Sequence, residues 1–201
     1  EQTTTRYKEL ADCGFNISFT HFRNRHSLAK GLKACSGTGV KIMVMCGDEL
    51  ENNTSEVVNQ FKNDPNVCGW FLYDEPTCDD FKSLRAFRDR ILAVDKKHQL
   101  YLNLYPLCFA DALKAKTYRD YVERFAKEVD LGFISFDHYP VLEDISSGKV
   151  GVTSLRSNFY ANLEDIRNVS ETVGQPFWAF ALSTAHDPYP VASREILHLE
   201  V

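Results

Sequence analysis

Short apolar runs alternate with amphipathic stretches along the whole chain, and this alternation restricts the possible folds more than any other feature. Six runs are too short for buried helices, are rich in β-branched and aromatic residues, and are mostly apolar on both faces. They span residues 16–20, 41–46, 69–73, 100–104, 133–136 and 177–182. Runs of this kind are typical of parallel strands that are covered on both sides.

Amphipathic segments with helical spacing lie between these runs. They span residues 5–13, 26–35, 53–62, 78–97, 117–129 and 154–173, and another begins over 193–199. The longest places Phe81, Leu84, Phe87 and Ile91 on one face. Regular alternation of strand and helix predicts a parallel sheet with crossover helices, hence an α/β fold.

Two architectures of this class compete: an open doubly wound sheet and a closed (β/α)8 TIM-type barrel. No G-x-G-x-x-G or P-loop string follows the first strand, as a doubly wound nucleotide-binding sheet would require. Polar and aromatic residues instead follow nearly every strand, which is typical of the barrel. We therefore expect residues 1–201 to form a single, partial barrel domain that contains strands two to seven. The open edges of such a barrel should promote self-association.

Composition and charge exclude several classes of partner. The net charge is −5 and no basic run exceeds a pair, so we expect no nucleic-acid partner. No apolar stretch reaches the ~20 residues that span a bilayer. The six cysteines contain no C-x-x-C pair, so zinc-ligand spacing is missing, and one or two disulfides remain open. Trp70 and Trp178 are expected in the core, with contact between Trp178 and a sugar face as the alternative.

The segment GWFLYDEP, residues 69–76, carries the most informative polar residues. A buried strand leads directly into Asp74 and Glu75, and Pro76 ends the ladder. Because adjacent residues of a strand face opposite ways, one carboxyl can face a cleft while the other supports it. The alternative is that these acids only cap the following helix.

Further polar residues follow the other strands. Asp137, His138 and Tyr139 leave the strand of FISFDHYP together, and such groups can orient hydroxyls or transfer protons. The alternative is that Asp137 anchors the loop while Tyr139 packs. Four more candidates at strand ends are Asn103, Tyr105, Asp48 and His21. A barrel would bring all of them to one rim.

With Glu75-Pro76 at the end of its fourth strand, the chain resembles the clan A glycoside hydrolases. The segments YLNLYP, ISFDHYP and PFWAF are similar to a branch of bacterial sugar-degrading barrels. The family has Asn-Glu-Pro at this position, so the resemblance implies that Glu75 is the general acid/base. Asp74 replaces the family's Asn, which puts a sugar contact through that amide in doubt.

A second departure concerns the nucleophile. The family carries another Glu at the end of the seventh strand, where this chain has Ser183-Thr184-Ala185-His186-Asp187. A second carboxylate must therefore come from Asp137, Asp48, Asp187 or an eighth strand.

The sequence thus predicts a glycoside hydrolase that cleaves a glycosidic bond in an oligo- or polysaccharide, secreted or periplasmic in a bacterium. Its catalytic residues would be Glu75 and Asp137, with no cofactor. The predicted substrate-binding residues are Asp74, Asn103, Tyr105, His138, Tyr139, Asp48 and His21. One alternative is a carbohydrate-binding barrel without catalysis. Another is a metal-dependent isomerase or aldolase in which Glu75, Asp137, His138 and Asp48 bind a divalent cation.

Overall fold

A computed structural model describes residues 2–143, 153–185, 189–191 and 193–200 of the chain, and it contains a strand at each of the six predicted positions. The strands are β1 (Ile17–His21), β2 (Lys41–Met45), β3 (Val67–Asp74), β4 (Gln99–Asn103), β5 (Ile134–Phe136), β6 (Val141–Glu143), β7 (Thr153–Leu155) and β8 (Phe177–Ala179). The α-helices are α1 (Thr4–Asp12), α2 (Arg25–Cys35), α3 (Gly47–Asn52), α4 (Thr54–Phe61), α5 (Phe81–Leu92), α6 (Tyr118–Glu128), α7 (Phe159–Val173) and α8 (Arg194–Glu200). Two 3-10 helices, η1 (Cys78–Asp80) and η2 (Leu107–Ala112), follow β3 and β4.

The chain divides into two compact units, and each unit is made of two separate segments of the sequence. The first unit contains Glu1–Asp74 and Lys82–Leu102, and the second contains Glu75–Phe81 and Asn103–Val201. Strand β4 contributes to both, because the boundary lies between Leu102 and Asn103.

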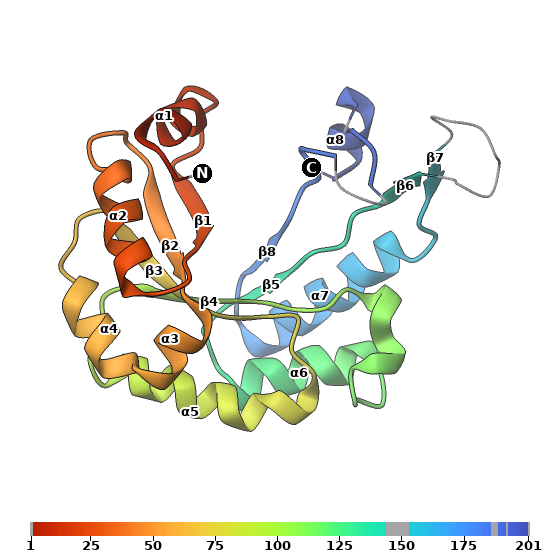
Figure 1. The fold of residues 1–201 in the computed structure, drawn as a ribbon. Coiled ribbons are helices and arrows are strands. Elements are labelled where there is room, and N and C mark those ends of the chain that lie inside the picture. The colour runs from red at the N-terminus through yellow and green to blue at the C-terminus, as the bar shows by residue number, and fades with distance from the viewer. Residues whose placement is uncertain (1, 144–152, 186–188, 192, 201) are drawn as a thin grey trace. The chain divides into compact units, whose positions relative to one another are not determined.

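The first unit is built on a sheet with the strand order β1-β2-β3-β4. The β1–β2 and β2–β3 pairs are parallel. Helices α2 and α4 lie on the same side of this sheet (Figure 1) and bury Leu28 and Val58. Trp70 of β3 is fully buried and its Nε1 donates to Asp95 Oδ2 at 2.9 Å, so the prediction for this tryptophan is confirmed.

The second unit has a parallel pair of its own, and a single bridge precedes it. Leu104 makes a single parallel bridge to Phe136 of β5, and β5 pairs in parallel with β8. Helices α6 and α7 lie side by side (Figure 1) and bury Phe125 and Ile166. Strands β1 to β4 thus form one sheet in which the β1–β2 and β2–β3 pairs are parallel, and among the described residues β5 lies in a separate two-stranded sheet with β8.

Three local expectations were wrong. Residues 154 and 155 were expected in a helix, but they belong to β7, which pairs antiparallel with β6, and α7 begins at Phe159. The helix predicted over 78–97 is a 3-10 turn followed by α5, which ends at Leu92. Trp178 was expected in the core but is 47% exposed, with its ring 4.8 Å from that of Phe133. At residues 154 and 155 the pairing with β6 overrides the local helical pattern.

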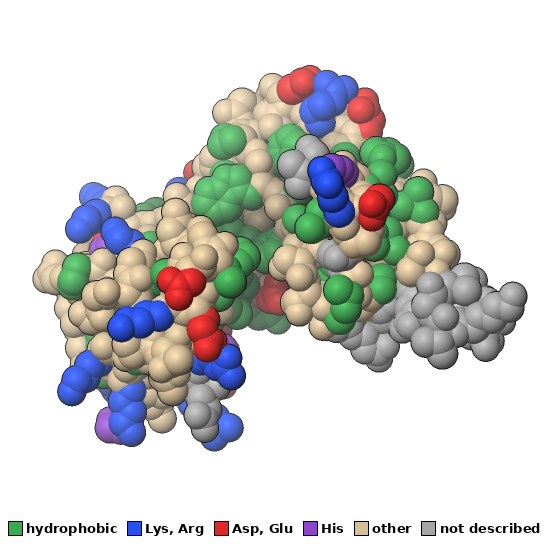
Figure 2. Space-filling view, turned by 90° about the horizontal axis from the view of Figure 1, so that it is seen from above, with side chains coloured by type: hydrophobic (Ala, Val, Ile, Leu, Met, Phe, Trp, Pro, Cys, Tyr) green, Lys and Arg blue, Asp and Glu red, His purple; other side chains and the backbone are tan. Residues whose placement is uncertain are grey.

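The surface carries mixed charge. On the face shown in Figure 2, Lys and Arg side chains are interspersed with acidic and uncharged ones. Among the helices in the described ranges, none is both long and apolar enough to cross a membrane.

Candidate functional site

Glu75 is the first residue after β3, and its backbone is in the left-handed region with φ 51°. Its side chain is half-buried, and its N–H donates to the Asn103 carbonyl oxygen at 2.9 Å. A left-handed backbone costs a residue with a β-carbon about 1–2 kcal/mol. Such strain is characteristic of functional sites, and here it is found at the carboxylate that the sequence singled out.

The first turn after Glu75 has its own cap. The N–H and the hydroxyl of Thr77 both donate to Asp80 Oδ2 at 2.8 Å. The reciprocal pair Thr77–Asp80 therefore caps η1, so the capping alternative does not require Asp74 or Glu75. Asp74 is exposed and is the last residue of β3.

Backbone hydrogen bonds connect the end of β3 to the ends of β4 and β5. Beyond the Glu75–Asn103 bond, the Leu104 N–H donates to the Ser135 carbonyl oxygen at 2.8 Å. Asn103 is 3% exposed, and its Oδ1 lies 3.5 Å from Ser135 Oγ. The ladder therefore places Glu75 and Asp137 at the same edge, because Asp137 directly follows β5.

Tyr121 of α6 links the two loops that leave this edge. Its hydroxyl donates to the Pro76 carbonyl oxygen at 2.7 Å and accepts from the Tyr105 N–H at 3.4 Å. The side chain is fully buried, and its ring stacks on that of Phe81 with 5.5 Å between the ring centroids. This burial raises the pKa of the Tyr121 phenol. Tyr121 is thus a neutral donor that fixes the backbone on either side of the site.

His138 is a buried, neutral imidazole. It is 2% exposed and its Nδ1 lies 2.8 Å from Asn162 Oδ1. The Leu107 N–H also donates to Asn162 Oδ1, at 2.7 Å, so this atom is an acceptor and His138 Nδ1 must carry the proton. Burial lowers the pKa of His138, an effect that the Asn162 hydrogen bond opposes and the Arg156 charge reinforces. Its Nε2 therefore has a free lone pair.

Two buried polar atoms of this cluster have no hydrogen-bond partner among the residues that the structure describes. They are His138 Nε2, an acceptor, and Asn162 Nδ2, a donor. Asn162 itself is fully buried on α7. The sequence singled out His138 but carried no signal for Asn162, which appears as an ordinary polar residue of an amphipathic helix.

Arg156 is a second residue that sequence reasoning missed. Its N–H donates to the Pro140 carbonyl oxygen at 2.7 Å, which places it opposite the segment that carries Asp137, His138 and Tyr139. Its Nη2 donates to the Tyr189 hydroxyl at 3.2 Å, and the Tyr189 ring meets the Tyr139 ring edge-on at 4.9 Å.

The charges of this region act on one thiol. Burial raises the pKa of Cys108; the Arg156 charge lowers it, and the charges of Asp137 and Glu75 raise it further. Oδ1 of Asp137 is shielded from solvent. The two carboxylates predicted as catalytic and one arginine are therefore close enough to act on the same group. All six cysteines are free thiols.

Glu200 of α8 is another carboxylate that the sequence did not single out. Its Oε2 accepts from the Leu182 N–H at 2.5 Å, three residues after the end of β8. Burial raises the pKa of Glu200, and the hydrogen bond from Leu182 opposes this. A carboxyl group is thus present near the end of the strand where the sequence showed no Glu.

The remaining predicted residues lie in the first unit or outside the described residues. His21 is the exposed last residue of β1, and Asp48 is exposed in the first turn of α3. The turn after β2 was expected to be a site loop but forms this helix. His186 and Asp187 lie outside the described residues.

The metal-dependent alternative has no observation in its favour. Within the described ranges, no three histidine, cysteine, aspartate or glutamate side chains come together in the way a metal ion would need.

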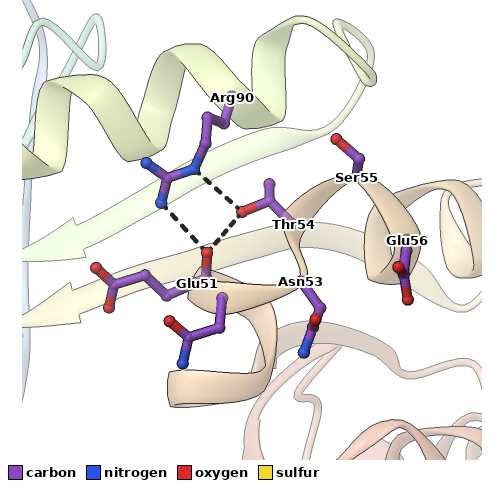
Figure 3. Close-up of a pocket in the computed structure, with 7 residues that line it drawn as sticks. Glu51, Asn53, Thr54, Ser55, Glu56 and Arg90 are labelled. Atoms are coloured by element: carbon purple, nitrogen blue, oxygen red, sulfur yellow. Dashed lines mark hydrogen bonds between the residues drawn. The ribbon is translucent and has the colours of Figure 1, made fainter.

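A polar pocket of about 210 Å³ lies in the first unit, lined by residues 51–56 and Arg90. Arg90 donates to Thr54 Oγ1 at 3.4 Å and to the Glu51 carbonyl oxygen at 3.3 Å, and Thr54 donates to that oxygen at 3.0 Å (Figure 3). These bonds tie the turn between α3 and α4 to α5. None of the predicted site residues lines the pocket, so we interpret it as a structural connection.

Comparison with solved structures identifies similar folds. A protein assigned as an α-L-fucosidase from Bacteroides thetaiotaomicron aligns with a TM-score of 0.61 at 11% identity, covering 98% of this chain and 73% of that one. A β-1,4-D-mannanase from Cryptopygus antarcticus aligns with a TM-score of 0.51 at 12% identity, covering 96% and 80%. Xylanase 10B from Thermotoga maritima aligns with a TM-score of 0.52 at 15% identity, covering 92% and 69%.

No protein-family model and no curated protein sequence matches the chain. At these identities the structural likeness shows the fold alone. The chain therefore has a glycosidase-like α/β fold with parallel strands.

Proposed function

We propose that this chain is a glycoside hydrolase with a (β/α)8-type fold, in which Glu75 is the general acid/base and Asp137 the second carboxylate. The observation that carries the proposal is the ladder from Glu75 through Asn103 and Leu104 to β5. It puts a strained glutamate and a partly buried aspartate at one edge of the strands. The glycosidase-like fold supports the same assignment.

In this mechanism Glu75 protonates the glycosidic oxygen as the bond to the leaving group breaks. Asp137 either attacks the anomeric carbon or activates a water molecule. A carboxyl gap of about 5–5.5 Å suits the first route, and about 6.5–9.5 Å suits the second. Asn103, Tyr105, His138 and Tyr139 would contact sugar hydroxyls. An exported location, secreted or periplasmic, belongs to the same proposal because polysaccharides do not cross membranes.

We also propose that residues 1–201 form one domain. Strand β4 is common to both units, so neither can unfold completely without losing part of the other. A single calorimetric transition is expected; two separate transitions would contradict the proposal.

The test is Glu75→Gln, measured on aryl glycosides with a leaving group that needs protonation. We expect turnover to fall by at least ~100-fold, the low end for loss of an acid/base group, with the melting temperature preserved. Asp79→Asn is the matched control, because Asp79 is an exposed carboxylate in the same loop. Near-normal turnover in Glu75→Gln would end the assignment, and sugar binding without turnover in the wild type would favour a binding protein.

Asp137→Asn and Glu200→Gln identify the second carboxylate. We expect the larger loss of turnover in Asp137→Asn. The reverse order would assign the role to Glu200, whose raised pKa and position after β8 make it the competing candidate.

A further inference from the structure

Arg156 lies beside the candidate catalytic segment because of the β6–β7 hairpin. Val141 is paired with Leu155 in this hairpin, and the Arg156 N–H donates to the Pro140 carbonyl oxygen at 2.7 Å. Pro140 ends the run that begins with Asp137. The backbone of Arg156 is thereby fixed next to that run.

The guanidinium group is held against an aromatic ring. Its Cζ lies 5.8 Å from the centroid of Tyr189, and its Nη2 donates to the Tyr189 hydroxyl at 3.2 Å. Stacking leaves the in-plane N–H groups of an arginine available for other acceptors. Tyr139 packs edge-on against the same ring, so Arg156, Tyr189 and Tyr139 form one contiguous group of side chains.

Among the residues that the structure describes, Arg156 has no ion-paired carboxylate, unlike most other arginines. Arg119 pairs with Asp165 and Arg124 with Glu128, whereas no carboxylate within the described ranges forms an ion pair with Arg156. Its Nε is buried and has no acceptor in that part of the chain. Leaving such a donor unsatisfied is unfavourable, and more so for a charged group.

The positive charge is also positioned among the proposed catalytic groups. The Arg156 charge lowers the pKa of His138, Cys108 and Tyr189. The charges of Asp137 and Glu75 raise the pKa of the same Cys108 thiol. An anionic ligand would be repelled by these carboxylates unless a cation received its charge. A guanidinium fork matches the two oxygens of a carboxylate or a sulfate.

We propose that Arg156 binds an anionic group of the substrate, so that the enzyme acts on an acidic glycan bearing either a uronic-acid carboxylate or a sulfate ester. This inference rests on the proposed function. Arg156 is a specificity-determining residue, and the free N–H groups of its guanidinium receive the anion while Tyr189 and Tyr139 line the sugar face.

The first experiment compares aryl glycosides in matched sets, each with a neutral sugar, its uronide and its 6-sulfate. The sets cover the gluco, galacto and manno series in both anomers. We expect the highest kcat/KM on an acidic member, with the uronide and sulfate arms identifying which anion is preferred. Arg156→Gln should lower kcat/KM for that member at least ~10-fold, about 1.4 kcal/mol, and change the neutral partner less than ~2-fold. Arg156→Lys, which keeps the charge, should recover part of the loss.

Arg167→Gln is the matched control, because Arg167 is an exposed, ion-paired arginine in the same unit. A preference for a neutral sugar, or equal losses on acidic and neutral substrates in Arg156→Gln, would overturn the inference while leaving the hydrolase assignment intact.

A second measurement keeps the inference testable if no glycoside is cleaved, a result that would count against the proposed function. Thermal shift assays then compare glucuronate, galacturonate, glucose 6-sulfate and neutral glucose. Stabilisation by an acidic sugar that is lost in Arg156→Gln supports the anion site. Absence of any shift, or an equal shift in both proteins, overturns it.

Discussion

Glu75 and His138 each occupy an environment that costs free energy. The left-handed backbone of Glu75 is unfavourable by about 1–2 kcal/mol. It is maintained by the bond from its own N–H to Asn103 and by the bond from Tyr121 to the following carbonyl oxygen, that of Pro76. His138 is buried with its Nε2 lacking a partner in the described structure. Lys114 and Asp130 also have a positive φ, so the strain at Glu75 supports a functional role only together with its position at the strand end.

His138 should make stability depend on pH. Burial lowers its folded pKa below the ordinary value of about 6.5, so the unfolded state binds the proton first as pH falls. The free energy of unfolding should therefore fall below about pH 6.5, by up to ~1.4 kcal/mol per pH unit, until the folded pKa is reached. Urea unfolding between pH 7 and 5 should show a shallower decline in His138→Gln than in the wild type.

The control for this pH series is His198→Gln, because His198 is exposed in the same unit. It should retain the wild-type slope. A His138→Gln profile with the wild-type slope would show that folding does not lower the pKa of His138.

At the scale of elements, α6 positions the two loops that follow β3 and β4. Thr117 caps the helix by accepting from the Asp120 N–H at 3.1 Å, and the apolar face of the helix then presents Tyr121 to the backbone beyond β3 and β4. One hydroxyl serves both loops, so the helix couples the conformations of Glu75 and Tyr105. In the proposed enzyme Tyr121 would be a positioning residue, because its hydroxyl bonds to backbone groups of the two loops.

Tyr121→Phe should reveal this role. The ring packing survives, but the Pro76 carbonyl oxygen loses its donor, at an expected cost of about 1–3 kcal/mol in the free energy of unfolding. Turnover should fall by more than the loss of folded protein accounts for, with kcat affected more than KM. Tyr160→Phe, at a tyrosine 57% exposed on α7, should change neither quantity. A drop in activity that merely follows the folded fraction would reduce Tyr121 to a structural residue.

At the scale of the whole molecule, the outer strands of the sheets are where backbone groups could pair with another copy. β1 is the outer strand of the four-stranded sheet, and β8 is paired only with β5 in the described structure. The Gln2 side chain donates to the His21 carbonyl oxygen at 2.8 Å and so covers one group of the β1 edge. Unpaired strand edges promote association between chains.

We expect concentration-dependent self-association through these edges. Light scattering between micromolar and submillimolar protein should show a rising average mass. Association through backbone pairing should persist at high salt, where surface charge contacts are screened. A constant monomer mass over this range would contradict the prediction.

The sequence by itself determined the six strands and the polar residues that follow them. It could do so because period and apolar content are local properties, and because Pro76 and Pro140 end their strands wherever the chain folds. Glu75, Asp137 and His138 could be singled out on this basis. The hydrophobic pattern also located most helices, with boundaries shifted where a cap such as Thr77 intervenes.

Only the tertiary structure decided which side chains meet. The β6–β7 hairpin, the exposure of Trp178, the bond from Tyr121 to Pro76 and the position of Arg156 opposite Pro140 all depend on partners distant in the sequence. Arg156 carries no local signal, because a single arginine after a short β-branched run is ordinary. Its meaning arises from a ring more than thirty positions away and from the lack, among the described residues, of an acid paired with it. A local pattern specifies the conformation of a segment, whereas contacts between segments, and hence the site, are set by the packing of the whole unit.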